Sequence, residues 1–326
     1  MIDEEDLTAR LLRLAAGPRD ASPERIAGVR DAVHRQWQIG RRRRMIRRTA
    51  AIAALGIAAS VVIAVWLHRP GLVETPHDRV AIARRVEGRP LIVRPTQRHD
   101  VGQPLTASAS VEAAAFIETD DASRAALQTP EGYSVRIDRA SRVRFLAPAV
   151  LEVQAGAVYI ASTDGQHGFE VRTPLGNLRD MGTQFEVRLA VSSLRLRVRT
   201  GVVEIRRRAR VTTAAAGTEA TITSSDVDIR LVPVFGSEWA WTTDIAPQFP
   251  IEGRTLRAFL EHTATEEGWT LHYAQPDLAD AAARIVLHGS VDGLKAQDAL
   301  QVVLATSGLR YSLRDGELAV GRAVER

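Results

Sequence analysis

Hydrophobic positions divide the chain into four regions with different spacing. Residues 1–48 carry apolar side chains at helical intervals, and residues 49–67 form an uninterrupted apolar run. Residues 80–244 alternate apolar and polar positions as strands do, and residues 247–326 mix both periods. The pattern predicts a short helical segment, a membrane-spanning helix, an all-β domain and a small α+β domain.

The run from Thr49 to Leu67 predicts a transmembrane helix. Nineteen helical residues extend about 28 Å, close to the hydrocarbon thickness of a bilayer. A cleaved signal peptide would begin near residue 1 and be followed by small residues, and a buried soluble helix seldom runs this long without a polar face. We therefore expect a single-pass membrane protein.

The charges that flank this run predict its orientation. Six arginines precede it and two basic residues follow it, so residues 1–48 are expected in the cytoplasm and residues 68–326 across the membrane. The arginines can bind anionic lipid headgroups, and Trp66 suits the interface at the other end of the run. The residues predicted to anchor the chain in the lipid bilayer are Arg41, Arg42, Arg43, Arg44, Arg47, Arg48 and Trp66.

The N-terminal segment contains one well-formed apolar stripe. Ile26, Val29, Val33 and Trp37 follow one another at helical spacing. The stripe can pack against a preceding short helix, or it can dock in a groove of a soluble partner. The second interpretation makes these four residues the candidate partner-binding site.

The β region contains an arginine ladder and an internal repeat. Arg195, Arg197 and Arg199 share one face of a strand, which predicts a solvated face, with a surface for an acidic partner as the alternative. Residues 151–160 match residues 196–205 at Leu, Val, Gly, Val and Ile. Repeated strand–turn–strand units favour a mainly antiparallel fold, either a solenoid-like stack or ordinary hairpins.

About 55 residues of this region resemble the FecR family of periplasmic domains. The order is a strand with G-x-V, then F-x-V-x-T-P, then G-T-x-F-x-V, then V-x-x-G-x-V. The residues that carry the resemblance are Gly156, Phe169, Thr173, Pro174, Gly182, Thr183, Phe185 and Gly201.

The C-terminal region predicts alternating helices and strands. Gly268 is expected to end the first helix, and Asp315-Gly316 to form a hairpin turn. The predicted elements are a helix from Leu256 to Thr263, strands at 269–273 and 285–288, a helix at 294–306, and a hairpin of 309–313 with 317–320. This order resembles the STN domain, the short N-terminal module of secretins and TonB-dependent transducers.

The composition limits the kinds of functional site that the chain can contain. The 326 residues contain 43 basic and 39 acidic side chains and no cysteine, so a disulfide framework and a thiolate nucleophile are excluded. The basic surplus lies in residues 1–48, and nothing else predicts direct binding of nucleic acid. No phosphate-binding, dinucleotide-binding or metalloprotease motif occurs. We expect no enzyme activity, no cofactor and no metal site.

The resemblances imply a signal-transducing regulator of the inner membrane. In the FecR family the periplasmic domains receive a signal from the signalling domain of a TonB-dependent transducer, and the cytoplasmic segment binds an extracytoplasmic-function sigma factor as an anti-sigma factor. The alternative is a membrane-tethered envelope scaffold or binding module that binds another envelope protein or a polysaccharide and has no sigma-factor partner. The short N-terminal segment, with Trp37 as its one tryptophan, keeps this alternative open.

Overall fold

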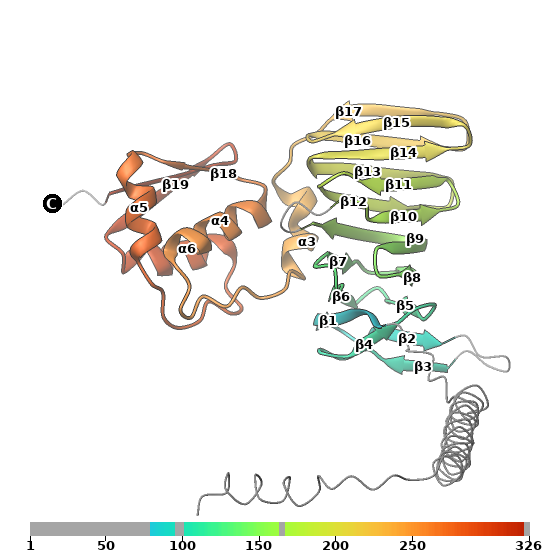
Figure 1. Ribbon diagram of the computed structural model, residues 1–326, viewed down its shortest axis with the longest axis horizontal. Helices are drawn as coiled ribbons and strands as arrows, with labels where there is room; N and C mark the ends of the chain where they lie inside the picture. The colour runs from blue at the N-terminus through green and yellow to red at the C-terminus, as the bar shows by residue number, and fades with distance from the viewer. Residues whose placement is uncertain (1–78, 95–100, 163–166, 323–326) are drawn as a thin grey trace, which may run out of the picture. The chain divides into compact units, whose positions relative to one another are not determined.

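Figure 1 shows the computed structural model of the chain, which describes residues 79–94, 101–162 and 167–322. Residues from Thr75 to Arg326 belong to one compact unit. The predicted cytoplasmic segment (1–48) and membrane span (49–67) lie outside the described residues. Within those described, no helix is both long and apolar enough to cross a membrane.

Seventeen strands of the described chain form two sheets that share one strand, β9. In sheet A the spatial order is β4 (Ser110–Glu112), β1 (Arg79–Glu87), β6 (Arg124–Gln128), β7 (Ser134–Ile137), β9 (Val150–Ala161), β12 (Gln184–Leu189), β13 (Ser193–Thr200), β16 (Thr218–Thr223) and β17 (Val227–Leu231). In sheet B it is β3 (Val101–Pro104), β2 (Leu91–Arg94), β5 (Phe116–Glu118), β8 (Arg142–Ala147), β9, β10 (Glu170–Thr173), β11 (Gly176–Asp180), β14 (Val202–Arg207) and β15 (Arg210–Ala215).

Hairpins alternate between the two sheets along the second half of this stack (Figure 1). The hairpin β10–β11 lies in sheet B, β12–β13 in sheet A, β14–β15 in sheet B and β16–β17 in sheet A. All strand pairs of the two sheets are antiparallel except β9 with β10. This arrangement agrees with the predicted all-β, mainly antiparallel fold, and the stacking of hairpins is solenoid-like.

Glycines stand where the chain crosses from one sheet to the other, which explains the internal repeat. Gly156 divides β9 into a half that pairs in sheet B and a half that pairs in sheet A, and its φ is +82°. Gly201 lies between β13 in sheet A and β14 in sheet B, and its φ is +74°. Residues with a side chain rarely adopt this backbone conformation. The two copies of the repeat are therefore two corners of the stack.

The main core fills the space between the sheets. Leu194, Leu196 and Val198 of β13 and Phe185 and Val187 of β12 are each fully buried there. These residues lie two apart because successive strand side chains point to opposite faces. The strands thus use one face for the core, and the other face of sheet A is free for other contacts.

A short linker leads from the stack to an α+β segment. It contains the 3-10 helix η1 (Ser237–Trp239) and α3 (Ala240–Asp244). The segment that follows has a core of its own, with β20 pairing parallel to β18 and antiparallel to β19. Its elements are α4 (Leu256–Glu267), β18 (Thr270–Tyr273), α5 (Pro276–Arg284), α6 (Ala296–Ala305), β19 (Leu309–Arg314) and β20 (Glu317–Arg322).

Most predicted elements of this segment are present, and two differ. Gly268 ends α4 with a φ of +72°, as predicted, and Thr255 caps its start by accepting a hydrogen bond from the amide of Ala258. The predicted strand at 285–288 is wrong, because only Val286 forms an isolated bridge, with Thr255. Helix α5 was not predicted; Pro276 begins it at the first helical position.

Candidate functional site

The outer face of sheet A carries a row of polar side chains that crosses six strands. In register, Arg136 of β7 lies opposite Tyr159 of β9, and Tyr159 lies opposite Glu186 of β12. The row continues through Arg197 of β13, Glu219 of β16 and Arg230 of β17. Opposite charges on neighbouring strands attract one another, so the row supports the sheet. We call these six residues the polar row.

Acidic residues of the polar row neutralise the arginine ladder. Glu219 accepts a hydrogen bond from Arg197 at 2.5 Å and is paired with Arg230 at 2.7 Å. Burial would raise the pKa of Glu219, but its hydrogen bonds with the two arginines outweigh this effect and lower the pKa. Glu186 is likewise within 3.4 Å of Arg195 and within 3.8 Å of Arg197.

The predicted solvated arginine face is therefore wrong for two of its three members. Arg197 is 7% exposed and Arg199 is 2% exposed. An arginine is rarely buried to this extent unless it is paired. Glu186 and Glu219 pair with Arg195 and Arg197, and Arg199 donates to backbone carbonyls of the same chain.

The linker covers the middle of this face with two tryptophans. Trp239 and Trp241 form a second apolar cluster with Tyr159, Ile245 and the three alanines Ala126, Ala157 and Ala161. The indole of Trp239 donates to the carbonyl of Pro233 at 3.0 Å, and that of Trp241 donates to Glu186 at 3.3 Å. Small side chains on β6 and β9 leave room for these large rings.

Arg136 joins the sheet to the end of α4. Its guanidinium donates to the carboxylate of Glu266 at 2.8 Å and to the carbonyl of Thr242 at 2.8 Å. Arg136 is 1% exposed. Burial would raise the pKa of Glu266, but the charge and hydrogen bond of Arg136 outweigh it and hold the pKa below its ordinary value. The ion pair persists to lower pH than an ordinary carboxylate would allow.

Arg199 reaches the same helix end from a bulge in β13. Phe185 pairs with Val198 and Gln184 with Thr200, so Arg199 is the extra residue between them. It donates to the carbonyl of Glu266 at 2.5 Å and to that of Val234 at 3.1 Å. The guanidinium also lies 4.4 Å from the ring centre of Trp239.

The helix end suits these two arginines for a general reason. The last carbonyls of a helix have no partner within the helix and carry partial negative charge. Arg199 binds one of these carbonyls, and Arg136 binds the side chain beside it. Glu266 is thus the main link between α4 and sheet A. We call Arg136, Arg199, Trp239 and Glu266 the junction.

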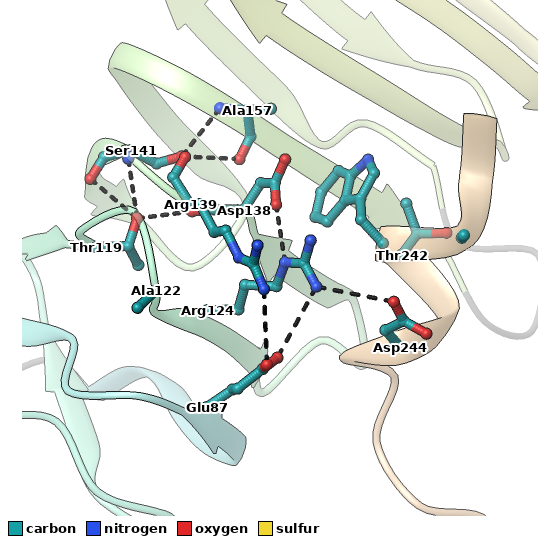
Figure 2. A network of polar contacts seen from close by, with 12 residues as sticks. Glu87, Thr119, Ala122, Arg124, Asp138, Arg139, Ser141, Ala157, Thr242 and Asp244 are labelled. Atoms are coloured by element: carbon teal, nitrogen blue, oxygen red, sulfur yellow. Dashed lines mark hydrogen bonds and ion pairs between the residues drawn. The ribbon is translucent and has the colours of Figure 1, made fainter. Parts of the chain in front are cut away.

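A second polar network lies beside the junction and is shown in Figure 2. Asp138 pairs with Arg124 at 2.9 Å and with Arg188 at 2.7 Å, and Arg124 also approaches Glu87 and Asp244 of α3. Burial would raise the pKa of Asp138, but the hydrogen bonds from the arginines and the backbone lower it. This network binds both β1 and the linker to the edge of the same face.

The corner next to this network is held by two hydroxyl groups (Figure 2). Thr119 donates to the carbonyl of Asp138 at 2.6 Å and accepts from the amide of Ser141 at 2.9 Å. The Ser141 hydroxyl accepts from the amide of Ala157 at 3.0 Å. Backbone groups that a corner would leave unpaired are thus satisfied.

The junction combines one ion pair, one helix end and the buried ring of Trp239, from segments far apart in the sequence. Among residues 79–94, 101–162 and 167–322, no group of three or more His, Asp or Glu side chains could hold a metal ion. The junction therefore joins two parts of one chain through noncovalent contacts.

The eight family-motif residues lie at strand ends and in the core of the stack. Phe169 and Phe185 are fully buried between the sheets, and Gly156, Gly182 and Gly201 stand at corners with positive φ. Thr173 and Pro174 lie at the β10–β11 turn, where the Thr173 hydroxyl donates to the carbonyl of Gly176 at 2.7 Å. The Thr183 hydroxyl donates to Asp180. These residues therefore form the core, the corners and a turn of the stack.

Other candidate residues lie outside the described part of the chain. These are the stripe Ile26, Val29, Val33 and Trp37, and the anchoring residues Arg41, Arg42, Arg43, Arg44, Arg47, Arg48 and Trp66. Their predicted roles stay predictions.

Sequence reasoning did not find the junction, although part of the signal was present. Arg136, Tyr159 and Glu186 each stand between apolar neighbours of a strand, so each could be assigned to the outer face. The two tryptophans of the linker were the sign that something covers that face. The partner, Glu266, stands 130 residues after Arg136 and no spacing rule connects them.

Comparison with known proteins agrees with the predicted resemblance in the β region. A family model described as FecR protein matches residues 115–204, which lie within the stack and include all eight motif residues. No curated protein matches the chain.

Two crystal structures of one bacterial protein are similar to the chain. The protein comes from Parabacteroides distasonis and is provisionally described as an anti-sigma factor. Each structure is 14% identical, with a TM-score of 0.34, and the match covers 64% of this chain and 99% of the other.

Proposed function

We propose that this protein is a single-pass inner-membrane regulator of the FecR type. Residues 1–48 hold an extracytoplasmic-function sigma factor in the cytoplasm, and the stack and the C-terminal segment receive a signal in the periplasm. The observation that carries the proposal is the FecR match at residues 115–204, in a chain with an arginine-flanked apolar run before the stack.

The C-terminal segment is the proposed receiver of the signal. Its three-stranded sheet and helices follow the stack at the place where an STN-like module is expected, and its sequence resembles that module. The partner would be the signalling domain of a TonB-dependent transducer or another envelope protein.

The junction is the proposed element with two states. A periplasmic partner that binds the segment better when α4 is released from sheet A would open the junction. The partner can shift this equilibrium only by its preference for one state over the other. The junction is suited to this role because its contacts are few and because Arg136 and Trp239, each 1% exposed, are buried in it.

Membrane topology is the first test. Reporter fusions that are active only in the cytoplasm or only outside it are placed before Met1 and after Arg326. We expect the N-terminal fusion to report the cytoplasm and the C-terminal fusion the periplasm. Both ends in one compartment would contradict the proposal.

Capture of the sigma factor is the second test. The full-length chain is purified from native membranes, and the recovery of sigma factors is measured for the wild type and for Trp37→Ala. We expect recovery to fall at least about tenfold, because a buried tryptophan commonly dominates an interface. Arg35→Ala, on the opposite side of the predicted helix, is the matched control and is expected to bind normally.

The outcome also separates the two candidate functions. Unchanged recovery in Trp37→Ala removes the stripe from the proposal. Capture of envelope proteins with no sigma factor, from the wild type, would support the tethered scaffold instead.

A further inference from the structure

The last hairpin leaves one end of the stack open. Strand β17 pairs with β16 on one side, and within the described residues no strand pairs with its other side (Figure 1). The side chains of Ile229 and Leu231 point toward the core, yet they are 40% and 86% exposed. A stack of this kind normally ends in a cap with a polar outer face. The apolar interior is therefore exposed at this end.

The free edge presents backbone groups as well as apolar side chains. Thr223 donates to the carbonyl of Asp226, and Val232 donates to the carbonyl of Gly217, so these positions bond toward β16. In an antiparallel pair the direction of bonding alternates along the strand. The amide and carbonyl of Ile229 therefore point away from β16, toward the free edge.

The sequence of β17 is complementary to itself. If two copies of the strand pair in antiparallel fashion about Ile229, Asp228 of one copy lies opposite Arg230 of the other, twice. The same register places Val227 opposite Leu231. Ile229 then forms a hydrogen-bonded pair with its own copy, and Asp228 and Arg230 form a non-hydrogen-bonded pair, in which side chains are closer.

The charges of this edge favour such a pairing. The Asp228 carboxylate is exposed and makes no ion pair or hydrogen bond within the described residues. The side chain of Arg230 is 63% exposed although it also contacts Glu219. A second copy supplies the missing partner for Asp228. Across the sandwich, the other free edge, β15, begins with the charged Arg210, and its remaining residues 211–215 carry no charge.

We propose that β17 is a dimer interface, at which two copies of the chain join edge to edge about a two-fold axis through Ile229. The occupant is a second copy because the strand provides its own opposite charges in register. The pairing continues both the sheet and the core across the axis and buries Ile229 and Leu231. It is independent of the proposed sigma-factor partner, since no residue before Thr75 takes part.

Single cysteines test the register, because the chain has no cysteine of its own. The full-length Ile229→Cys variant is oxidised in intact membranes, and dimers are quantified on non-reducing gels. Residues of a hydrogen-bonded pair have Cα atoms about 5.5 Å apart, within the range of a disulfide. We expect Ile229→Cys to form a covalent dimer.

Leu231→Cys is the matched control. It is more exposed than Ile229, but in the proposed register it lies about 14 Å from its own copy. We expect at least tenfold less dimer than with Ile229→Cys. When differently tagged Val227→Cys and Leu231→Cys chains are expressed together, we expect them to cross-link with each other.

A charge reversal tests the complementarity. Asp228→Arg, introduced into the Ile229→Cys chain, places arginine opposite arginine and is expected to reduce cross-linking at least tenfold. Asp121→Arg makes the same change at another exposed position and is expected to have no effect. No dimer from Ile229→Cys, or equal cross-linking by Leu231→Cys, would overturn the proposal.

Discussion

Gly201 and Gly182 stand at neighbouring corners and lie almost in contact. A Cβ atom added to Gly201 would be 2.4 Å from the carbonyl oxygen of Gly182, a backbone atom that cannot move aside. Gly217, at the next corner, has the same φ of +74°, but the atom nearest to its added Cβ is 3.8 Å away. The two positions therefore separate backbone strain from steric overlap.

We predict that Gly201→Ala lowers the free energy of unfolding by about 3 kcal/mol, because strain and overlap add. Gly217→Ala is expected to cost about 1 kcal/mol, from strain alone. Denaturant titration of the two variants measures the difference. Equal losses would mean that the close approach of the two corners contributes nothing.

Single residues show the limit of pattern-based prediction. Alternation correctly placed Arg195, Arg197 and Arg199 on one face and Leu194, Leu196 and Val198 on the other. It could not show what covers the arginine face, because the covering residues come from a linker and a helix later in the chain. It also could not show the bulge that directs Arg199 to α4.

At the scale of elements, two adjacent carboxylates at the end of α4 have opposite pKa shifts. The pKa of Glu266 is lowered because Arg136 outweighs its burial, so its contribution to stability is present at neutral pH. That contribution is lost as the pH falls below 4.5 and through the folded-state pKa. Burial raises the pKa of Glu267, so its charged form at neutral pH opposes folding.

We predict that Glu266→Gln weakens docking of α4 at pH 7 by about 3 kcal/mol, since it leaves the buried Arg136 charge unpaired. Glu267→Gln, the matched control, is expected to leave docking unchanged or strengthen it. Hydrogen exchange of residues 233–250 measures docking. Wild-type exchange should rise below pH 4.5 toward the level of Glu266→Gln, and identical behaviour of the two variants would contradict the assignment.

Elements were predictable in proportion to the length and clarity of their pattern. Helix α4, with Gly268 after it, and the hairpin β19–β20 were evident from the sequence. Helix α5 was missed because its alanine-rich sequence buries only Leu278 and Ala282. The apolar residues at 285–288 resemble a strand, but only Leu287 is buried and only Val286 forms a bridge, with Thr255, so no ladder of hydrogen bonds is present.

At the scale of the whole molecule, Trp239 connects the stack, the linker and the end of α4. Its ring is 1% exposed and packs against Tyr159 at 6.2 Å and under the Arg199 guanidinium. We predict that Trp239→Ala destabilises the state in which α4 is docked on sheet A by about 3 kcal/mol, because a large buried ring is lost. The core between the sheets does not include Trp239 and should stay intact.

Limited proteolysis measures this effect. In Trp239→Ala, cleavage within residues 233–250 should accelerate while the stack remains resistant. Trp269→Ala, whose ring packs in the core of the C-terminal segment, should instead expose that segment. Global loss of resistance in Trp239→Ala would show that the junction and the stack fold as one unit.

The sequence indicated an all-β region and an α+β segment, and their order is observed. The matched repeat indicated stacking, but it did not show that successive hairpins belong to opposite sheets. The direction of each crossing depends on corners whose glycines look alike in the sequence. The contact between the two regions was not predictable either. Arg136 and Glu266 are 130 residues apart, and the sequence around each residue does not indicate which partner it has.

The alternation of hairpins between sheets restricts how this architecture can change in size. One additional hairpin between β13 and β14 would send every later hairpin to the opposite sheet, and Glu219 of β16 and Arg230 of β17 would leave the polar row. Two additional hairpins would restore the order. Stacks should therefore lengthen or shorten by even numbers of hairpins. The last hairpin then stays in sheet A, whose outer face the linker covers.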